Sequence, residues 1–211
     1  MISMMKIESV SSQPDRAGRY KVSFSDGSTM RLYRHTVEDF GLYSGKELDT
    51  KAFSELQEAA GKMSAKMRAV RIVSASSVSK KDLEQRLIHK GEDAGHAKEA
   101  VAWMSEMDLL DDRKTAEQIV HRCVSKGYGV NRAKQMLYEK RIPKEFWDAA
   151  LEDYPDQTDA IDAYLRSHIQ DPKDEKQVRK AVDALLRRGH RYGEVRSVLA
   201  EMSFDEMFLE E

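Results

Sequence analysis

The sequence has very little of several features that mark particular classes of protein. It contains one cysteine, Cys123, in 211 residues, which excludes an internal disulfide framework and favours a reducing compartment. No apolar run approaches the roughly 20 residues that a helix needs to cross a bilayer. The opening residues, MISMMKIESV, lack the apolar core and small-residue cleavage site of a signal peptide. We therefore expect a soluble cytoplasmic protein with no membrane association.

The sequence also lacks an excess of charge of either sign. The formal net charge is −2, which argues against a uniformly basic coat for nucleic acid. Charged residues nevertheless make up 34% of the chain and hydrophobic residues 40%, a combination typical of solvated amphipathic helices. Any electrostatic binding surface must therefore arise from segregation of charge along the chain.

A β pattern is present only near the start of the sequence. The runs RYKVSF and TMRLYR alternate apolar and polar residues, and between them SDGS supplies Asp26-Gly27, a pair suited to a two-residue turn. A shorter strand is expected to begin at Ile7. The stretch VEDFGLYSGKELD predicts short turns, and a helical pattern begins at Thr50. Residues 1–48 are thus expected to form a small antiparallel β segment, too small to be stable alone.

From about residue 63 to residue 203 the sequence is helical and repeats itself. An offset of 50 residues, followed by one of 48, superposes three segments without gaps. The aligned sets are Leu83, Ala133 and Ala181; Leu87, Leu137 and Leu185; Ala97, Trp147 and Val195; Val101, Leu151 and Leu199; and Met104, Tyr154 and Met202. Each segment breaks at one place, near Gly91, Arg141 and Gly189, and Pro143 suits the first turn of the helix that follows its break.

A further amphipathic helix precedes each of these helix pairs, over residues 66–76, 112–126 and 158–169, and Asp111 or Asp112 is a plausible N-cap for the middle one. The sequence therefore predicts a mainly α protein with three tandem three-helix repeats that share a core by stacking. The predicted boundaries are 1–48 for the β segment, 49–110 for a linker helix and the first repeat, 111–155 for the second repeat, and 156–211 for the third repeat and an acidic tail.

The sign of the charge alternates along these repeats. Residues 62–90 hold eight Lys/Arg and two Asp/Glu, and residues 92–112 hold one lysine and seven acids. Residues 113–144 hold nine basic and two acidic residues, and residues 145–162 hold seven acids and no Lys or Arg. Residues 173–196 are basic again, eight against four, and five acids follow from Glu201. The first two helices of each repeat are thus basic and the third is acidic.

This alternation has two interpretations that do not exclude each other. If the repeats stack in parallel, their basic helices form a stripe that attracts polyanions, above all nucleic-acid phosphates, with an affinity that weakens in salt. Alternatively, acidic and basic helices neutralise one another between adjacent repeats, through surface pairs worth roughly 0–1 kcal/mol each.

We find no catalytic constellation in the sequence and expect neither an enzyme, a metal nor a cofactor. The six histidines, at positions 35, 89, 96, 121, 168 and 190, do not have the spacing of metal ligands. Cys123 is expected to be a buried small hydrophobe rather than a nucleophile. SKGYGVNR predicts a turn between basic helices, and LDD and EDYPD predict helix caps and solvated helix ends. Trp147 is expected in the core and Trp103 partly exposed.

The helical region resembles the RecX family of bacterial regulators of the RecA recombinase. The resemblance runs through SKKDLEQRLIHKGEDAGHAKEAVAWMSEMDLLDDRKTAEQIV and YGVNRAKQMLYEKRI and covers residues 63–203. Its most specific element is Leu-Leu-Asp-Asp followed by Ala116, preceded by the break at Lys90-Gly91. Three features depart from the family pattern: Thr115 replaces an aromatic residue, Arg141-Ile142 replaces Gly-Ile, and SASSVSKKDL lacks a preceding Pro-Arg.

The resemblance implies a curved, elongated array of three-helix repeats that binds RecA. Such proteins lie in the groove of the RecA filament on single-stranded DNA, suppress strand exchange and ATP hydrolysis, and are not enzymes. The partners implied for this chain are the RecA filament and single-stranded, possibly also double-stranded, DNA, with the chain itself a monomer.

Ten basic residues are predicted to meet DNA phosphates or an acidic recombinase surface. They are Lys81, Arg86, Lys90, Arg132, Lys134, Lys140, Arg141, Arg179, Arg187 and Arg188. Two alternatives stay open: a free-standing DNA-binding protein that uses its helix pairs as helix-turn-helix readers, and a purely structural adaptor whose partner affinity hardly depends on salt.

Overall fold

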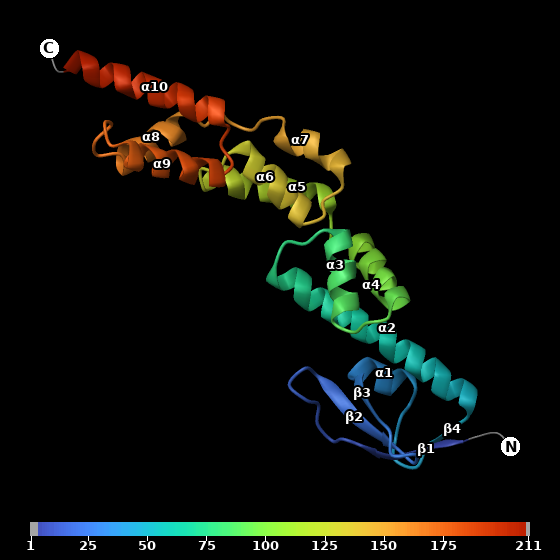
Figure 1. The fold of residues 1–211 in the computed structure, drawn as a ribbon. Helices are drawn as coiled ribbons and strands as arrows, with labels where there is room; N and C mark the ends of the chain where they lie inside the picture. Colours follow the sequence, from blue (N-terminus) through green and yellow to red (C-terminus); the bar gives the residue numbers. More distant parts are fainter. Residues whose placement is uncertain (1–3, 210–211) are drawn as a thin grey trace. The chain divides into compact units, whose positions relative to one another are not determined.

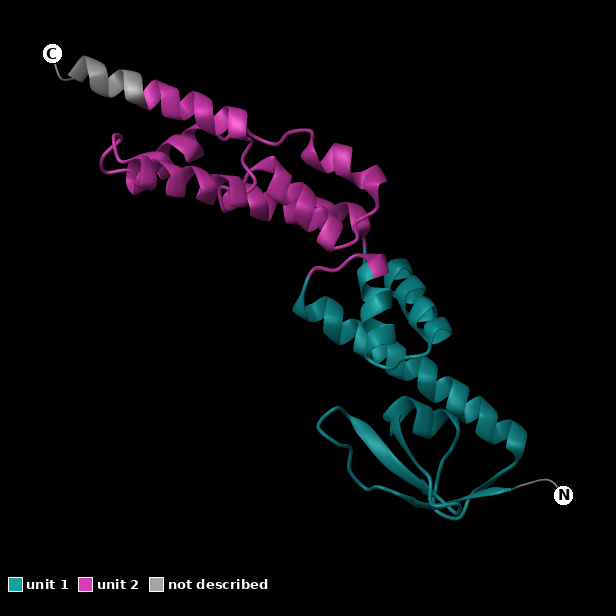
Figure 2. Cartoon of the chain, viewed as in Figure 1, with its two compact units in different colours: residues 1–76, 82–110 teal, residues 77–81, 111–211 magenta. Residues whose placement is uncertain are grey.

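The computed structural model describes residues 4–209 of the chain, and it describes side chains as far as Met202. The chain is mainly helical, with one small sheet near its N-terminus (Figure 1). It divides into two compact units, unit 1 with Met1–Ser76 and Asp82–Leu110 and unit 2 with Ser77–Lys81 and Asp111–Glu211 (Figure 2). The side chains of the predicted acidic tail from residue 203 onward lie outside the described residues.

Unit 1 opens with an antiparallel sheet in the order β3-β2-β1-β4. The strands are β1 Met5–Val10, β2 Arg19–Phe24, β3 Thr29–Tyr33 and β4 Glu47–Leu48. The three predicted strands are confirmed, and the short β4, which pairs with β1, lies where the sequence predicted turns. Four residues, 25–28, connect β2 to β3 rather than the predicted two; the Phe24 N–H donates to the Ser28 carbonyl at 3.0 Å, and Gly27 adopts a φ of 82°.

The sheet is stabilised by a hydrophobic cluster that continues into the neighbouring helices. Ile7, Val22 and Phe24 are fully buried in it together with Leu56 of helix α2. The ring of Phe24 meets Phe53 edge to face, with centroids 5.2 Å apart. A short helix, α1 Arg34–Asp39, stands where the sequence predicted a turn. Packing against a helix provides the burial that a sheet of this size cannot supply alone.

Helix α2 runs without interruption from Thr50 to Ala75. The sequence predicted a separate helix from residue 66, but nothing terminates the helix before Ser76, and Asp49 caps its start by accepting a hydrogen bond from the Ala52 N–H at 2.7 Å. Gly61 lies inside this helix and leaves room for a neighbouring side chain, since a Cβ atom there would lie 2.4 Å from the His96 ring. His96 belongs to α4 (Ala94–Glu106), which packs against α2 and follows α3 (Lys80–His89).

Unit 2 contains the helices of the second and third repeats. They are α5 Asp112–Ser125, α6 Val130–Glu139, the 3₁₀ helix η1 Lys144–Phe146, α7 Trp147–Leu151, α8 Thr158–His168, α9 Glu175–Arg187 and α10 Tyr192–Leu209. The helices predicted over residues 112–126 and 158–169 are confirmed. The third helix of the second repeat is shorter than the aligned positions suggested, because it begins as a 3₁₀ turn after Pro143 and ends before Tyr154.

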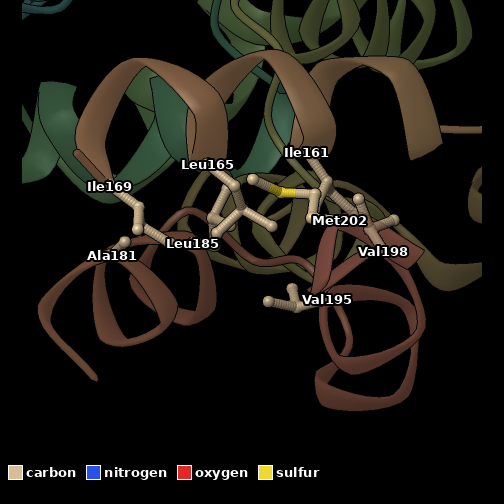
Figure 3. Close-up of a cluster of buried hydrophobic side chains, with 8 residues drawn as sticks. All are labelled: Ile161, Leu165, Ile169, Ala181, Leu185, Val195, Val198 and Met202. Carbon is tan, nitrogen blue, oxygen red and sulfur yellow. The ribbon is translucent and has the colours of Figure 1, made fainter. Parts of the chain in front are cut away.

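The repeats are visible in the buried positions and in the breaks between helices. Leu87, Leu137 and Leu185 are each at most 1% exposed. In the third repeat, α8, α9 and α10 surround a cluster in which Leu165 and Met202 point toward each other (Figure 3). The second and third helices of each repeat are separated by a residue in the left-handed region, with φ values of 88° at residue 91, 54° at residue 141 and 88° at residue 189. The chain therefore contains three tandem three-helix repeats after a small β segment, as predicted.

Candidate protein and nucleic-acid interface

The ten predicted contact residues all belong to one kind of element. Lys81 and Arg86 lie on α3, Arg132 and Lys134 on α6, and Arg179 and Arg187 on α9, and the other four follow the ends of these helices. These are the second helices of the three repeats. The position aligned at Lys90, Lys140 and Arg188 is basic every time, and it follows the last residue of each helix. A cation there also stabilises the negative end of the helix dipole, so this recurrence has a structural cause beside any functional one.

The ten side chains differ in how available they are for a partner. Lys81, Lys90, Lys134, Arg141, Arg179 and Arg187 are exposed, whereas Arg86, Arg132, Lys140 and Arg188 are half-buried. Arg86 pairs with Asp82 at 3.0 Å and Arg132 with Glu139 at 3.6 Å. Between residues 4 and 202, the six exposed cations form no ion pair with a carboxylate. They are the members of the set best placed to meet an external anion.

The second and third repeats join through backbone atoms. Gly129, the N-cap of α6, offers no side chain, and its N–H donates to the Arg188 carbonyl at 3.0 Å while the Asn131 N–H donates to the Gly189 carbonyl at 3.2 Å. The carbonyls after α9 thus satisfy free N–H groups at the start of α6. The two backbones are so close that a Cβ atom on Gly129 would lie 2.2 Å from the Gly189 oxygen. This junction requires glycine on both sides.

Two further side chains complete this junction. The guanidinium of Arg188 lies 5.6 Å from the ring centroid of Tyr128 and 5.1 Å from that of Tyr164, and it donates to the Lys126 carbonyl at 3.2 Å. His190 is 3% exposed, its Nε2 lies 3.1 Å from the Gly127 carbonyl oxygen, and burial lowers the pKa of its imidazole. Arg188 therefore holds the two repeats together and is a weaker candidate for partner contact than its neighbour Arg187.

The residues that lead into α3 meet the second repeat through side chains instead. The hydroxyl of Ser79 donates to the Lys140 carbonyl at 2.6 Å, and the Lys80 N–H donates to Asp112 at 2.8 Å. Asp112 is 6% exposed, and burial raises the pKa of its carboxyl group even though this hydrogen bond opposes the shift. Asp111, the confirmed N-cap of α5, accepts hydrogen bonds from the Arg113 and Lys114 N–H groups. The Asp-Asp pair thus caps one helix and holds the start of another.

A cavity of about 620 Å³ opens beside this side-chain junction. Lys81, Tyr138, Arg141, Lys144 and Trp147 line it together with Glu139, Ile142 and Pro143, and all of these residues belong to unit 2. Tyr138 is 72% exposed. Tyr138 and Lys144 were not among the contact residues predicted from the sequence. The available signal was an aromatic residue directly after the buried Leu137, on a face where an amphipathic helix ordinarily carries polar residues.

The side chains most relevant to catalysis are the thiol of Cys123, the hydroxyl of Tyr154 and any cluster of metal ligands. Cys123 is buried, as predicted, and burial raises the pKa of its thiol, which opposes formation of the nucleophilic thiolate. Among the described residues, no group of three His, Cys, Asp or Glu side chains is arranged to hold a metal ion. Burial also raises the pKa of Tyr154 to about 12, and its hydroxyl donates to the Tyr128 carbonyl at 2.6 Å.

Both tryptophans are half-buried. Trp147 packs against the core of the second repeat, as predicted, and its indole N–H donates to the Ile142 carbonyl at 3.0 Å. Trp103 lies on α4, with the ammonium of Lys66 5.2 Å from its ring centroid. The partial exposure predicted for Trp103 is confirmed.

Comparison with known proteins relates the chain to one family. Residues 111–151 match the family model described as RecX, second three-helix domain. The chain is 26% identical over 210 residues to the regulatory protein RecX of Clostridioides difficile (strain 630), which covers 95% of this chain and 96% of that protein. It is 32% identical over 125 residues to the regulatory protein RecX of Stenotrophomonas maltophilia (strain R551-3), which covers 58% of this chain and 77% of that protein.

A solved structure supports the fold. The crystal structure of a regulatory protein RecX superposes with a TM-score of 0.63, covering 92% of this chain and 98% of that one, at 18% sequence identity. Within residues 4–209, no helix combines the length and apolarity needed to cross a membrane. Since the sequence matches extend over the repeats and, in one relative, over almost the whole chain, the protein belongs to the RecX family of regulatory proteins.

Proposed function

We propose that this protein binds the RecA recombinase and its filament on single-stranded DNA, and that it inhibits strand exchange and ATP hydrolysis in DNA repair and recombination. The observation that carries the proposal is membership of the RecX family, including a relative matched over 95% of this chain. The sequence resemblance implies RecA as the partner. In this proposal the protein acts in the cytoplasm, as a monomer and without catalytic chemistry of its own.

The exposed cations of the second helices support an electrostatic contribution to this binding. Six of the ten predicted contacts are exposed, and each repeat contributes at least one of them. A filament presents the same surface many times, so that modest contacts from successive repeats can add through effective concentration. Contacts to phosphate would make the affinity depend strongly on salt.

The direct test measures ATP hydrolysis by RecA on single-stranded DNA with and without the protein. We expect hydrolysis to fall as the protein is added. Unchanged hydrolysis and unchanged strand exchange at saturating protein would contradict the proposal. Selective, sequence-specific binding to naked duplex, without any effect on RecA, would instead favour a free-standing DNA-binding protein.

Charge reversal tests the contribution of the second helices. The structure favours Lys134, Arg179 and Arg187 as sites for Glu substitutions, because they are exposed, whereas Arg132 is half-buried and ion-paired. We expect the triple variant to inhibit RecA at least tenfold less strongly at moderate salt. The matched control reverses three exposed cations of unit 1, Arg16, Lys21 and Arg31, which gives the same change in net charge. Equal losses in both variants would remove the second helices from the mechanism.

A further inference from the structure

We propose that the cavity lined by Lys81, Tyr138, Arg141, Lys144 and Trp147 binds a segment of single-stranded nucleic acid, with a base stacked on Tyr138 and the backbone phosphates held by the three cations. This inference deepens the proposed function, because it gives the protein its own contact with the strand on which the filament forms. It concerns naked nucleic acid, so it can fail or succeed independently of any effect on RecA.

The first support is the chemistry of the cavity lining. An isolated exposed aromatic residue is common on protein surfaces and needs no explanation. Here, however, Tyr138 shares a cavity of about 620 Å³ with three basic residues and with part of a tryptophan whose indole N–H is already bound to the protein. Aromatic faces beside a positively charged groove are the combination by which proteins bind single strands without reading their sequence.

The second support is the charge balance within the cavity. Between residues 4 and 202, Lys81, Arg141 and Lys144 have no carboxylate partner in an ion pair. The one acidic residue of the lining, Glu139, already accepts a hydrogen bond from Gln135 at 2.9 Å and pairs with Arg132 at 3.6 Å. The lining therefore has an excess of positive charge that fits a phosphate backbone.

The third support is the backbone of Arg141. This residue has a φ of 54°, in the left-handed region that side chains with a Cβ atom rarely adopt, and the aligned residues in the other two repeats are glycines. The helix ending would therefore be less strained with glycine at this position. Strain at one residue that also lines a cavity is the kind of observation from which a functional role can be inferred.

The junction between the second and third repeats provides an internal comparison. Its residues aligned with Lys81, Tyr138, Arg141, Lys144 and Trp147 are Asn131, Leu186, Gly189, Tyr192 and Val195. None of these five is basic. The unpaired cations and aromatic rings of this cavity are therefore not repeated at the aligned positions, and at the other junction Arg188 already lies over the rings of Tyr128 and Tyr164.

The test uses Trp147 as a reporter inside the cavity. The chain has two tryptophans, so Trp103→Phe leaves Trp147 as the only one, and its emission can be followed while oligothymidine is added. We expect saturable quenching by oligothymidine and much weaker quenching by an abasic oligonucleotide of the same length, which has the phosphates without the bases. Equal responses to both would show binding by charge alone and would overturn the proposal.

Two substitutions in the cavity, with one control outside it, locate the binding. Tyr138→Ala should weaken oligothymidine binding about tenfold, whereas Tyr192→Ala, which removes a tyrosine that is 60% exposed outside the cavity, should not. Arg141→Gly should also weaken binding, and it should lower the slope of log affinity against log salt by about 0.7. Because glycine suits the left-handed backbone, Arg141→Gly should keep or raise the melting temperature, which separates lost binding from lost folding.

Three results would overturn the inference. One is oligothymidine binding, measured by anisotropy, with no change in Trp147 emission, because the strand then binds elsewhere. Another is unchanged affinity in both Tyr138→Ala and Arg141→Gly. The last is tighter binding of an acidic peptide such as oligoglutamate than of oligothymidine, which would make the cavity a protein-docking site. An unchanged effect on RecA in these variants would separate the cavity from the proposed regulatory function.

Discussion

The two junctions between repeats join equivalent elements with different chemistry. Where the turn after α9 meets the start of α6, Gly129 and Gly189 let backbone atoms touch directly. Where the turn after α6 meets the residues that lead into α3, the hydroxyl of Ser79 and the carboxylate of Asp112 make the hydrogen bonds instead. The glycine junction leaves no room for a Cβ atom at Gly129 or Gly189, whereas the side-chain junction keeps Arg141 and has a cavity beside it. A repeat protein can thus place a binding site at one junction and pure packing at the next.

The largest expected effect comes from adding a methyl group to the glycine junction. Gly189→Ala places a Cβ atom 2.2 Å from the Arg132 nitrogen at a residue whose φ is 88°. Overpacking and left-handed strain together should cost about 3 kcal/mol or more, which lowers the melting temperature by roughly 6–12 °C. Thermal unfolding followed by circular dichroism measures the change.

Gly91→Ala is the matched control for this prediction. Gly91 has the same φ of 88°, but nothing lies within 4 Å of its Cβ position. This variant should lose only the strain contribution of about 1 kcal/mol. Equal losses in the two variants would show that close packing at the glycine junction contributes nothing.

Removing the buried carboxylate of the side-chain junction should lower the free energy of unfolding by less than Gly189→Ala does. Asp112→Ala leaves the Lys80 N–H without its acceptor, which should cost about 2 kcal/mol. Asp112→Asn keeps an oxygen acceptor and removes a carboxylate whose pKa is raised by burial, so it should retain most of the stability. Urea unfolding of both variants checks this prediction, which fails if Asn and Ala are equally destabilising.

Arg188 and Arg187 separate the structural from the binding role of neighbouring cations. Arg188→Ala removes contacts with two tyrosine rings and one carbonyl, and we expect a loss of about 1 kcal/mol. Arg187→Ala removes an exposed side chain and should change stability by less than about 0.5 kcal/mol. Melting temperatures test the pair, and a larger loss for Arg187 would reverse the assignment.

The smallest expected effect is a dependence on pH at the glycine junction. The pKa of His190 in the folded protein lies below the ordinary value of 6.5, so the unfolded chain binds the proton more readily. The stability that neutral His190 contributes is therefore present above about pH 6.5 and is lost as the pH falls through the folded pKa. Comparing unfolding free energies across this range with those of His190→Gln isolates the contribution. Parallel pH profiles for the two proteins would contradict it.

The repeat pattern made much of the fold predictable. Leu87, Leu137 and Leu185 recur at equivalent helical positions, and burial of apolar faces is the dominant force in folding, so their spacing located the helices and the breaks between them. Prediction was weaker where the apolar pattern is sparse. The sequence did not predict α1 or β4, and it predicted two helices where α2 is continuous. Polar stretches and linkers lack the apolar periodicity that specifies a structure.

The charge of the candidate site could be predicted from the sequence, but the exposure of each cation and the position of the cavity could not. The sequence identified the second helices as basic, because charge can be counted. It did not separate the exposed Arg187 from Arg188, because the groups that Arg188 contacts, the rings of Tyr128 and Tyr164 and the Lys126 carbonyl, lie far from it in the sequence. Tyr138 and Lys144 were not predicted because a cavity exists only in the folded chain, where Lys81 lies near residues 138–147.

By itself, the sequence determined the three-helix repeats and the alternation of charge, because both depend on residue types at short spacings. Only the tertiary structure decided which cations remain exposed, which residues join one repeat to the next and where a cavity opens. Those features depend on distances between atoms of different repeats, which periodicity along a single chain does not contain.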